Sequence, residues 1–390
     1  MMQLIRTIVL LSFLLLSACN QLDDYFLGKD NTPIPKKLPP ITHKVSFEEI
    51  WHINLGKKSA YMHEKLSPVV SGTGIYAVSP SGLVQKSNIK NGDLVWKQWI
   101  DNGISSGPTV ASGVVALGMH HSGVAVLNQA TGKLLWEQKV LGEVLANPLI
   151  IADKVIVKTV EGHLYAFHLT SGKKLWHVHH GSSELILKAS SSPVMNRNGL
   201  ILVGFADGKL DAVIAHTGEL AWQKGIIYGQ GASDVERLVD IDADPIVYGD
   251  TVLLASYQGF VVRVSLDNGE VLWKQPASVY QNMTLSSGKV FFVDDKSVVW
   301  AISSDNGQIF WRQVFLKARD LTSPVVTPLG IIVADKTGLM HILSAATGAT
   351  IGQTKLNSAI SMNPVTHGNM VYVLTVKGQL YAFRLTGKNT

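Results

Sequence analysis

Cysteine is almost missing from this sequence of 390 residues: Cys19 is the only one, so the chain can form no internal disulfide. Charged residues make up only 16% and hydrophobic residues 46%, which excludes disorder for most of the length. Basic residues gather in nothing larger than pairs such as Lys173-Lys174, and phosphate binding requires more concentrated charge, so we expect no nucleic-acid groove. Helical periodicity is also lacking. The 35 glycines instead favour a β-rich chain with many tight turns.

The N-terminus carries the pattern of an export signal. Arg6 precedes an apolar run at residues 7–16 that is too short to span a bilayer as a helix. The run ends in Leu16-Ser17-Ala18-Cys19, an order that resembles the bacterial lipobox. That resemblance implies cleavage before Cys19 and acylation of its sulfur and amino group, so that several acyl chains anchor the protein. An ordinary secretory signal beside a chance cysteine is the alternative.

The chain divides into three parts by composition. Residues 1–18 are the predicted lipoprotein signal peptide, and residues 19–46 a lipidated cysteine followed by a proline-rich tether without strand or helix periodicity. Residues 47–390 carry the repeats described next.

A turn followed by tryptophan recurs along the third part. The first two copies are Asn91-Gly92 with Trp96 and Thr131-Gly132 with Trp136. Steps between successive copies are 40, 40, 46, 51, 38 and 41 residues, a period typical of propeller blades. With the last copy reading glycine instead of tryptophan, the eight equivalent positions are Trp51, Trp96, Trp136, Trp176, Trp222, Trp273, Trp311 and Gly352.

One repeat, read in full, gives four short strands at residues 147–151, 154–160, 163–168 and 175–178. The last repeat stops before its tryptophan strand, and residues 47–53 at the other end supply a matching segment. The prediction is therefore an all-β, eight-bladed β-propeller of four-stranded antiparallel blades, closed by pairing of the N-terminal strand with the last blade. A seven-bladed ring would leave one repeat unpaired.

Catalytic patterns are weak. The repeats resemble the tryptophan-docking repeats of pyrroloquinoline-quinone (PQQ) dehydrogenases and their non-enzymatic relatives. That resemblance implies, for an enzyme, adjacent cysteines near the cofactor and a calcium site. This chain has a single cysteine, and no cluster of acids recurs at a spacing that would bind calcium. The adjacent pairs His120-His121 and His179-His180 point to opposite faces of a strand, which favours surface or turn histidines. We therefore expect no enzyme activity, no cofactor and no metal.

Two consecutive connections between blades are longer than most of the others. Most run 12 or 13 residues from the tryptophan to the next proline, whereas those at 176–193 and 222–245 are longer and belong to adjacent blades. The first holds an apolar tripeptide, residues 185–187, and the second an acidic and apolar mixture. This layout indicates a partner-binding patch. Alternatively, the apolar residues extend a strand and the acids stabilise their own loop.

The second connection reads GASDVERLVDIDADP at residues 231–245 and resembles the corresponding loop of the BamB lipoprotein family of the outer-membrane β-barrel assembly machinery. Residues 185–188 resemble that family's Leu-x-Leu-Arg segment, with lysine in place of arginine. The resemblance implies a non-enzymatic scaffold at the periplasmic face of the outer membrane, which binds the POTRA domains of BamA and assists folding and insertion of outer-membrane proteins, with possible contact to those unfolded chains. A periplasmic propeller for another ligand, or a PQQ-dependent dehydrogenase relative, is the alternative. The implied partner-binding residues are Leu185, Leu187, Lys188, Arg237, Asp240 and Asp242.

Overall fold

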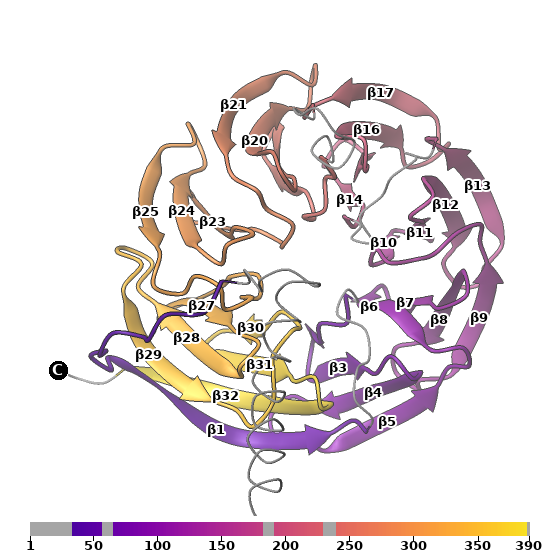
Figure 1. Cartoon of the computed structure of the whole chain (residues 1–390). Coiled ribbons are helices and arrows are strands. Elements are labelled where there is room, and N and C mark those ends of the chain that lie inside the picture. Colours follow the sequence, from indigo (N-terminus) through magenta and orange to yellow (C-terminus); the bar gives the residue numbers. More distant parts are fainter. Residues whose placement is uncertain (1–32, 57–64, 182–190, 229–238, 388–390) are drawn as a thin grey trace, which may run out of the picture. The chain divides into compact units, whose positions relative to one another are not determined.

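Eight four-stranded antiparallel sheets make up the described part of the chain, residues 33–56, 65–181, 191–228 and 239–387 of this computed structural model. Figure 1 shows the sheets arranged as blades around a ring, all of them within the compact unit formed by residues 37–390. Among the described residues no helix is long and apolar enough to cross a membrane. The predicted eight-bladed propeller is confirmed.

The first four blades follow one another along the chain, each with its strands in sequence order from the centre of the ring outward. Blade 1 comprises β2 (Val69–Ser71), β3 (Gly74–Val78), β4 (Leu83–Asn88) and β5 (Leu94–Trp99). Blade 2 comprises β6 (Ile104–Ala111), β7 (Val114–Met119), β8 (Gly123–Asn128) and β9 (Leu134–Lys139). Blade 3 comprises β10 (Leu149–Ile151), β11 (Lys154–Lys158), β12 (His163–His168) and β13 (Lys174–His179). Blade 4 comprises β14 (Val194–Met195), β15 (Leu200–Gly204), β16 (Lys209–Ile214) and β17 (Leu220–Gly225).

The remaining blades repeat the arrangement. Blade 5 comprises β18 (Ile246–Tyr248), β19 (Thr251–Ala255), β20 (Phe260–Ser265) and β21 (Val271–Pro276). Blade 6 comprises β22 (Thr284–Ser286), β23 (Lys289–Val293), β24 (Val299–Ser303) and β25 (Ile309–Gln313). Blade 7 comprises β26 (Val325–Thr327), β27 (Gly330–Ala334), β28 (Leu339–Leu343) and β29 (Thr350–Lys355). Blade 8 comprises β30 (Val365–His367), β31 (Met370–Leu374), β32 (Gln379–Gly387) and, as its outer strand, β1 (Val45–Asn54).

The ring closes through its two chain ends. β1 pairs antiparallel with β32 from Val45 opposite Gly387 to Asn54 opposite Gln379, with one bulge between Glu49 and Trp51. Figure 1 shows the indigo strand lying along the yellow one. The predicted closure is thus confirmed, with two more residues at the start of the strand and one more at its end. Closure gives blade 8 its fourth strand from the opposite end of the described chain.

Tryptophan positions join neighbouring blades. The indole Nε1 of Trp136, for example, donates to the carbonyl oxygen of Leu169 in the next blade across 2.8 Å. Five more indoles, those of Trp51, Trp96, Trp176, Trp273 and Trp311, make the equivalent bond at 3.0 to 3.2 Å. Each ring also lies on the turn glycine of that next blade. A Cβ on Gly132 would meet the ring of Trp96 at 2.5 Å, so the turn and the tryptophan recur together for a steric reason.

The eighth position lacks its tryptophan for a reason visible in the fold. A Cβ on Gly352 in β29 would meet the carbonyl oxygen of Val45 at 2.3 Å. The amide of Lys44 also donates to the carbonyl of Ile351 across 2.8 Å. The incoming N-terminal segment therefore occupies the space that an indole fills elsewhere.

Candidate functional site

The two long connections join β13 to β14 and β17 to β18, on either side of blade 4. Their central parts, which contain the predicted binding residues Leu185, Leu187, Lys188 and Arg237, lie outside the described residues, as does Cys19. What the structure describes is the base of each connection, where the chain enters the next blade.

A hydrogen bond joins these two bases directly. The amide of Ser192, at the end of the first connection, donates to Oδ1 of Asp244, at the end of the second, across 2.6 Å. Both residues precede the proline that opens a blade. The link belongs to a series in which the residue before one blade accepts a bond from the equivalent residue of the preceding blade. Its other members are Gly107 to Asn147, Asn147 to Ser192, Asp244 to Asn282, Ser323 to Asn363, and Asn363 to Ser67, at 2.8 to 3.2 Å.

Asp244 is the one acid at these eight positions, all of which are described. Its Oδ1 also accepts a bond from Lys65 Nζ at 2.7 Å, and its Oδ2 one from the Asn282 amide at 2.8 Å. Burial alone would raise the pKa of the Asp244 carboxyl, but Lys65 and the hydrogen bonds from Ser192 and Asn282 hold it below its ordinary value. Asp244 is therefore an ionised anchor for the base of the second connection.

The predicted binding residues Asp240 and Asp242 are each only 1% exposed. They alternate with the buried Val239, Ile241 and Ala243, so the whole stretch is interior. Neither carboxylate presents a surface to a partner in this conformation. Their position corresponds to the alternative in which the acids stabilise their own loop.

Asp242 is the less satisfied of the two. Neither of its carboxylate oxygens has a hydrogen-bond partner within the described structure. Burial, reinforced by the neighbouring Asp240, raises its pKa to about 8, against the opposing effect of Lys65 and Lys158. The carboxyl is thus protonated over much of the range in which ordinary aspartates are charged.

Lys158 in β11 is the residue that sequence reasoning missed. It is 4% exposed, and its Nζ donates to the carbonyl of Gly204 at 2.6 Å and to that of Ser191 at 3.2 Å. Burial and the charge of Lys65 lower its pKa to about 8, although the three aspartates favour its charged form. The signal in the sequence was a lysine that ends the otherwise apolar run Val155 to Val157, on a strand with two buried faces.

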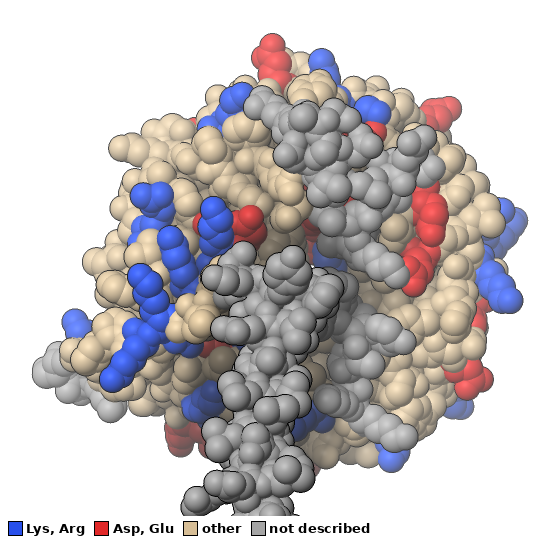
Figure 2. Space-filling view, in the orientation of Figure 1, with Lys and Arg blue, Asp and Glu red and all other residues tan. Residues whose placement is uncertain are grey.

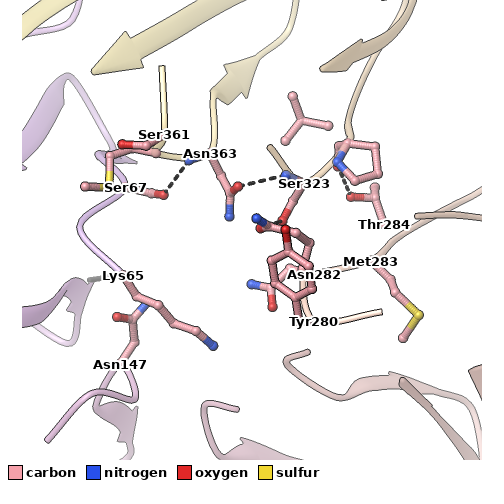
Figure 3. A pocket seen from close by; sticks show the side chains of 14 residues that line it. Lys65, Ser67, Asn147, Tyr280, Asn282, Met283, Thr284, Ser323, Ser361 and Asn363 are labelled. Atoms are coloured by element: carbon pink, nitrogen blue, oxygen red, sulfur yellow. Dashed lines mark hydrogen bonds between the residues drawn. The ribbon is translucent and has the colours of Figure 1, made fainter. Parts of the chain in front are cut away.

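Lys65, Lys158, Asp240, Asp242 and Asp244 act on one another electrostatically and form an ionic cluster. A cavity of about 370 Å³ adjoins this cluster at Lys65, which is one of its lining residues. Figure 3 shows Lys65 and Asn147 on one side of it and Tyr280, Asn282 and Thr284 on the other. Most of the lining residues carry an amide or hydroxyl group, among apolar residues such as Met283 and Met362. Within the described residues no group of three or more His, Cys, Asp or Glu side chains is placed to hold a metal ion.

Charge is unevenly spread over the face seen in Figure 2, where blue side chains gather over the region of β25 to β29. In this part of the chain Lys336, in the turn between β27 and β28, pairs with Asp320, and Lys355, the last residue of β29, donates to the carbonyl of Thr337. The basic residues are therefore more clustered in space than their scatter along the sequence suggested.

The fold and its tryptophan-docked repeats define a closed eight-bladed propeller with a buried ionic cluster below two long connections. A family model described as "Outer membrane protein assembly factor BamB" matches residues 80–313 and 319–390. A relative of that name from Legionella pneumophila (strain Paris) is 48% identical over 96% of this chain and 98% of its own length. One from Burkholderia pseudomallei (strain K96243) is 31% identical over 91% of this chain and 93% of its own. The chain belongs to the BamB family of outer membrane protein assembly factors.

Solved structures agree on the fold. The crystal structure of BamB from Moraxella catarrhalis superposes with a TM-score of 0.79 at 24% identity, covering 87% of this chain and 100% of that one. A europium-containing methanol dehydrogenase gives 0.72 at 15% identity, covering 87% and 93%. Enzymes therefore share the fold, but the curated relatives are named as assembly factors, which confirms the expectation of a non-enzymatic protein.

Proposed function

We propose that the chain is a lipid-anchored scaffold of the β-barrel assembly machinery that binds the periplasmic POTRA domains of BamA through its two long connections. The supporting observation is the bond from the Ser192 amide to Asp244, because it brings the bases of these connections together at one place on the ring. Family membership supports a role in outer-membrane protein assembly.

In this proposal the residues divide into two roles. Leu185 and Leu187 supply the apolar anchor, and Lys188 and Arg237 supply charge at its rim. Asp240 and Asp242 fix the path of the second connection, a role that their burial supports. A lysine at position 188 keeps the charge of the family arginine but lacks its two-pronged hydrogen bonding.

Co-purification with BamA from detergent-solubilised membranes tests the proposal. Wild type should retain BamA, and the Leu185→Asp, Leu187→Asp double variant should not. Leu141→Asp is a matched control, since Leu141 is 62% exposed in the connection between blades 2 and 3, which leaves its blade at the same end. Equal BamA recovery by wild type and the folded double variant would show that Leu185 and Leu187 are not part of the binding site. If wild type does not retain BamA, the proposed function is wrong.

Lipid anchoring is a separate part of the proposal. It rests on the Leu-Ser-Ala-Cys motif, which ends at Cys19. Labelled palmitate should enter the wild-type protein and not Cys19→Ala, and the variant should leave the membrane fraction. Incorporation of label into Cys19→Ala would refute this anchor.

A further inference from the structure

Three histidine side chains that are separated in the sequence lie together on blade 3. His177 and His179 are two residues apart on β13 and so share one face of the strand, and His163 on β12 pairs opposite His179. The same register places Tyr165 opposite His177. Three histidines therefore lie on one face of a single hairpin. Reasoning from the adjacent pair His179-His180 could not find this set, because neighbours in a strand point apart.

Two ring nitrogens of this group face each other. Nδ1 of His163 and Nε2 of His177 share a hydrogen bond across 3.1 Å, in which one nitrogen donates and the other accepts. Two nitrogens bound at about 2.0–2.1 Å to a tetrahedral Zn²⁺ are separated by about 3.3 Å, so the observed spacing is close to that of a chelating pair. An ion would take the place of the proton that the two nitrogens share, with each ring contributing one nitrogen.

Stacking holds both rings in place. The His177 ring stacks on Tyr165 with centroids 4.3 Å apart, and the His163 ring stacks on His179 at 4.2 Å. Tyr165 is itself fixed, because it is buried and its hydroxyl accepts a bond from the Leu141 amide at 3.1 Å. His177 is exposed and His163 partly so, which leaves the pair open to an ion from solution.

Metal ligation requires the neutral imidazole, so acid should weaken binding at this pair. The carboxylate of Glu161, in the turn before β12, is already engaged, since it accepts the Glu143 amide at 2.9 Å.

We propose that His163 and His177 form a surface site for a borderline divalent transition-metal ion such as Zn²⁺, with water completing the coordination. Imidazole is a preferred ligand for such ions, whereas Mg²⁺ and Ca²⁺ require oxygen donors. His179 supports the site by covering the His163 ring. The site lies on the β12–β13 hairpin of blade 3, whereas Lys158 is on β11 of the same blade.

Calorimetric titration of the full chain, without an added polyhistidine tag, with ZnCl₂ tests this site. Wild type should bind one Zn²⁺, and His163→Ala and His177→Ala should each weaken that binding by about tenfold or more. His216→Ala should leave the affinity unchanged, because His216 is an exposed histidine in a turn of blade 4. Circular dichroism and thermal melting establish that each variant is folded. Mg²⁺ at the same concentration should give no binding heat.

Co²⁺ provides a second readout that a purely structural role would not affect. Its visible absorption should show a nitrogen-ligated complex in wild type that is lost in either alanine variant. Zn²⁺ binding by wild type no tighter than by the His163→Ala, His177→Ala double variant would overturn the proposal. Loss of binding in His179→Ala as complete as in His177→Ala would overturn the assignment of the ligand pair.

Discussion

The ammonium group of Lys158 lies 2.6 Å from the carbonyl oxygen of Gly204, so a lysine of blade 3 is bonded to the backbone of blade 4 inside the protein. The same group reaches Ser191, where the first long connection ends. Asp240 and Asp242, where the second one ends, act on it electrostatically. A single buried cation thus lies between the bases of both connections.

Replacement of Lys158 tests how much this cation contributes to the free energy of unfolding. Lys158→Met keeps the length of the side chain but removes the Lys158 donor from the Ser191 carbonyl and one of two donors from the Gly204 carbonyl, which Ser191 Oγ also reaches. It also leaves Lys65 as the remaining lysine that acts on Asp242. We expect a loss of about 3 kcal/mol in the free energy of unfolding, measured by urea denaturation. Lys139→Met, at an exposed position of β9, should change it by less than about 0.5 kcal/mol. Equal effects of the two variants would contradict this account.

The protonation of Asp242 makes stability depend on pH. Its folded-state pKa of about 8 lies above the ordinary 3.8, so the folded protein keeps a proton that the unfolded chain has released. This contribution is fully present below about pH 4 and is lost as the pH rises toward 8, by about 1.4 kcal/mol per pH unit at most. Denaturation at about pH 5 and pH 7.5 should show a decline in wild type that is reduced in Asp242→Asn. Parallel pH profiles for the two proteins would exclude this group as the cause.

Docking of tryptophan on the turn glycine predicts unequal effects for two glycines of blade 2. Gly132 and Gly113 have similar positive φ angles, 74° and 78°, so alanine at either meets a similar backbone strain. Only at Gly132 does the new Cβ meet an indole, that of Trp96, while nothing lies within 4 Å at Gly113. Gly132→Ala should therefore be less stable than Gly113→Ala by about 1–3 kcal/mol in urea denaturation. Equal stabilities would show that the ring does not rest on the turn.

Restoring the missing tryptophan should harm the protein. Gly352→Trp recreates the repeat pattern, yet the Val45 carbonyl occupies the space, so we expect a loss of about 2 kcal/mol in the free energy of unfolding. Lys355→Trp, at an exposed position of the same strand, serves as the control. A stabilised Gly352→Trp variant would mean that the N-terminal segment does not lie over β29.

The repeats made the fold predictable because each carries its own turn, tryptophan and proline, and the incomplete last repeat pointed to residues 47–53. Even the exception at Gly352 was visible, although its cause, the path of Val45, depends on contacts between the two ends of the chain.

The site was less accessible to sequence reasoning. Asp240 and Asp242 read as surface acids because acids in long connections are usually solvated, whereas the structure buries them beside Lys158 from a strand some eighty residues earlier. The contact between His163 and His177 depends on how β12 and β13 are aligned. A repeat pattern does not reveal that alignment for single side chains.

In the proposed function, the face that carries the long connections contacts BamA. A photo-crosslinking amino acid placed at Leu187 in living cells tests it most directly, with Asn198 as the comparison site. Asn198 is exposed in the turn between β14 and β15, at the end of blade 4 opposite to the connections. We expect a BamA crosslink from position 187 and none from position 198. A crosslink from position 198 alone would contradict it.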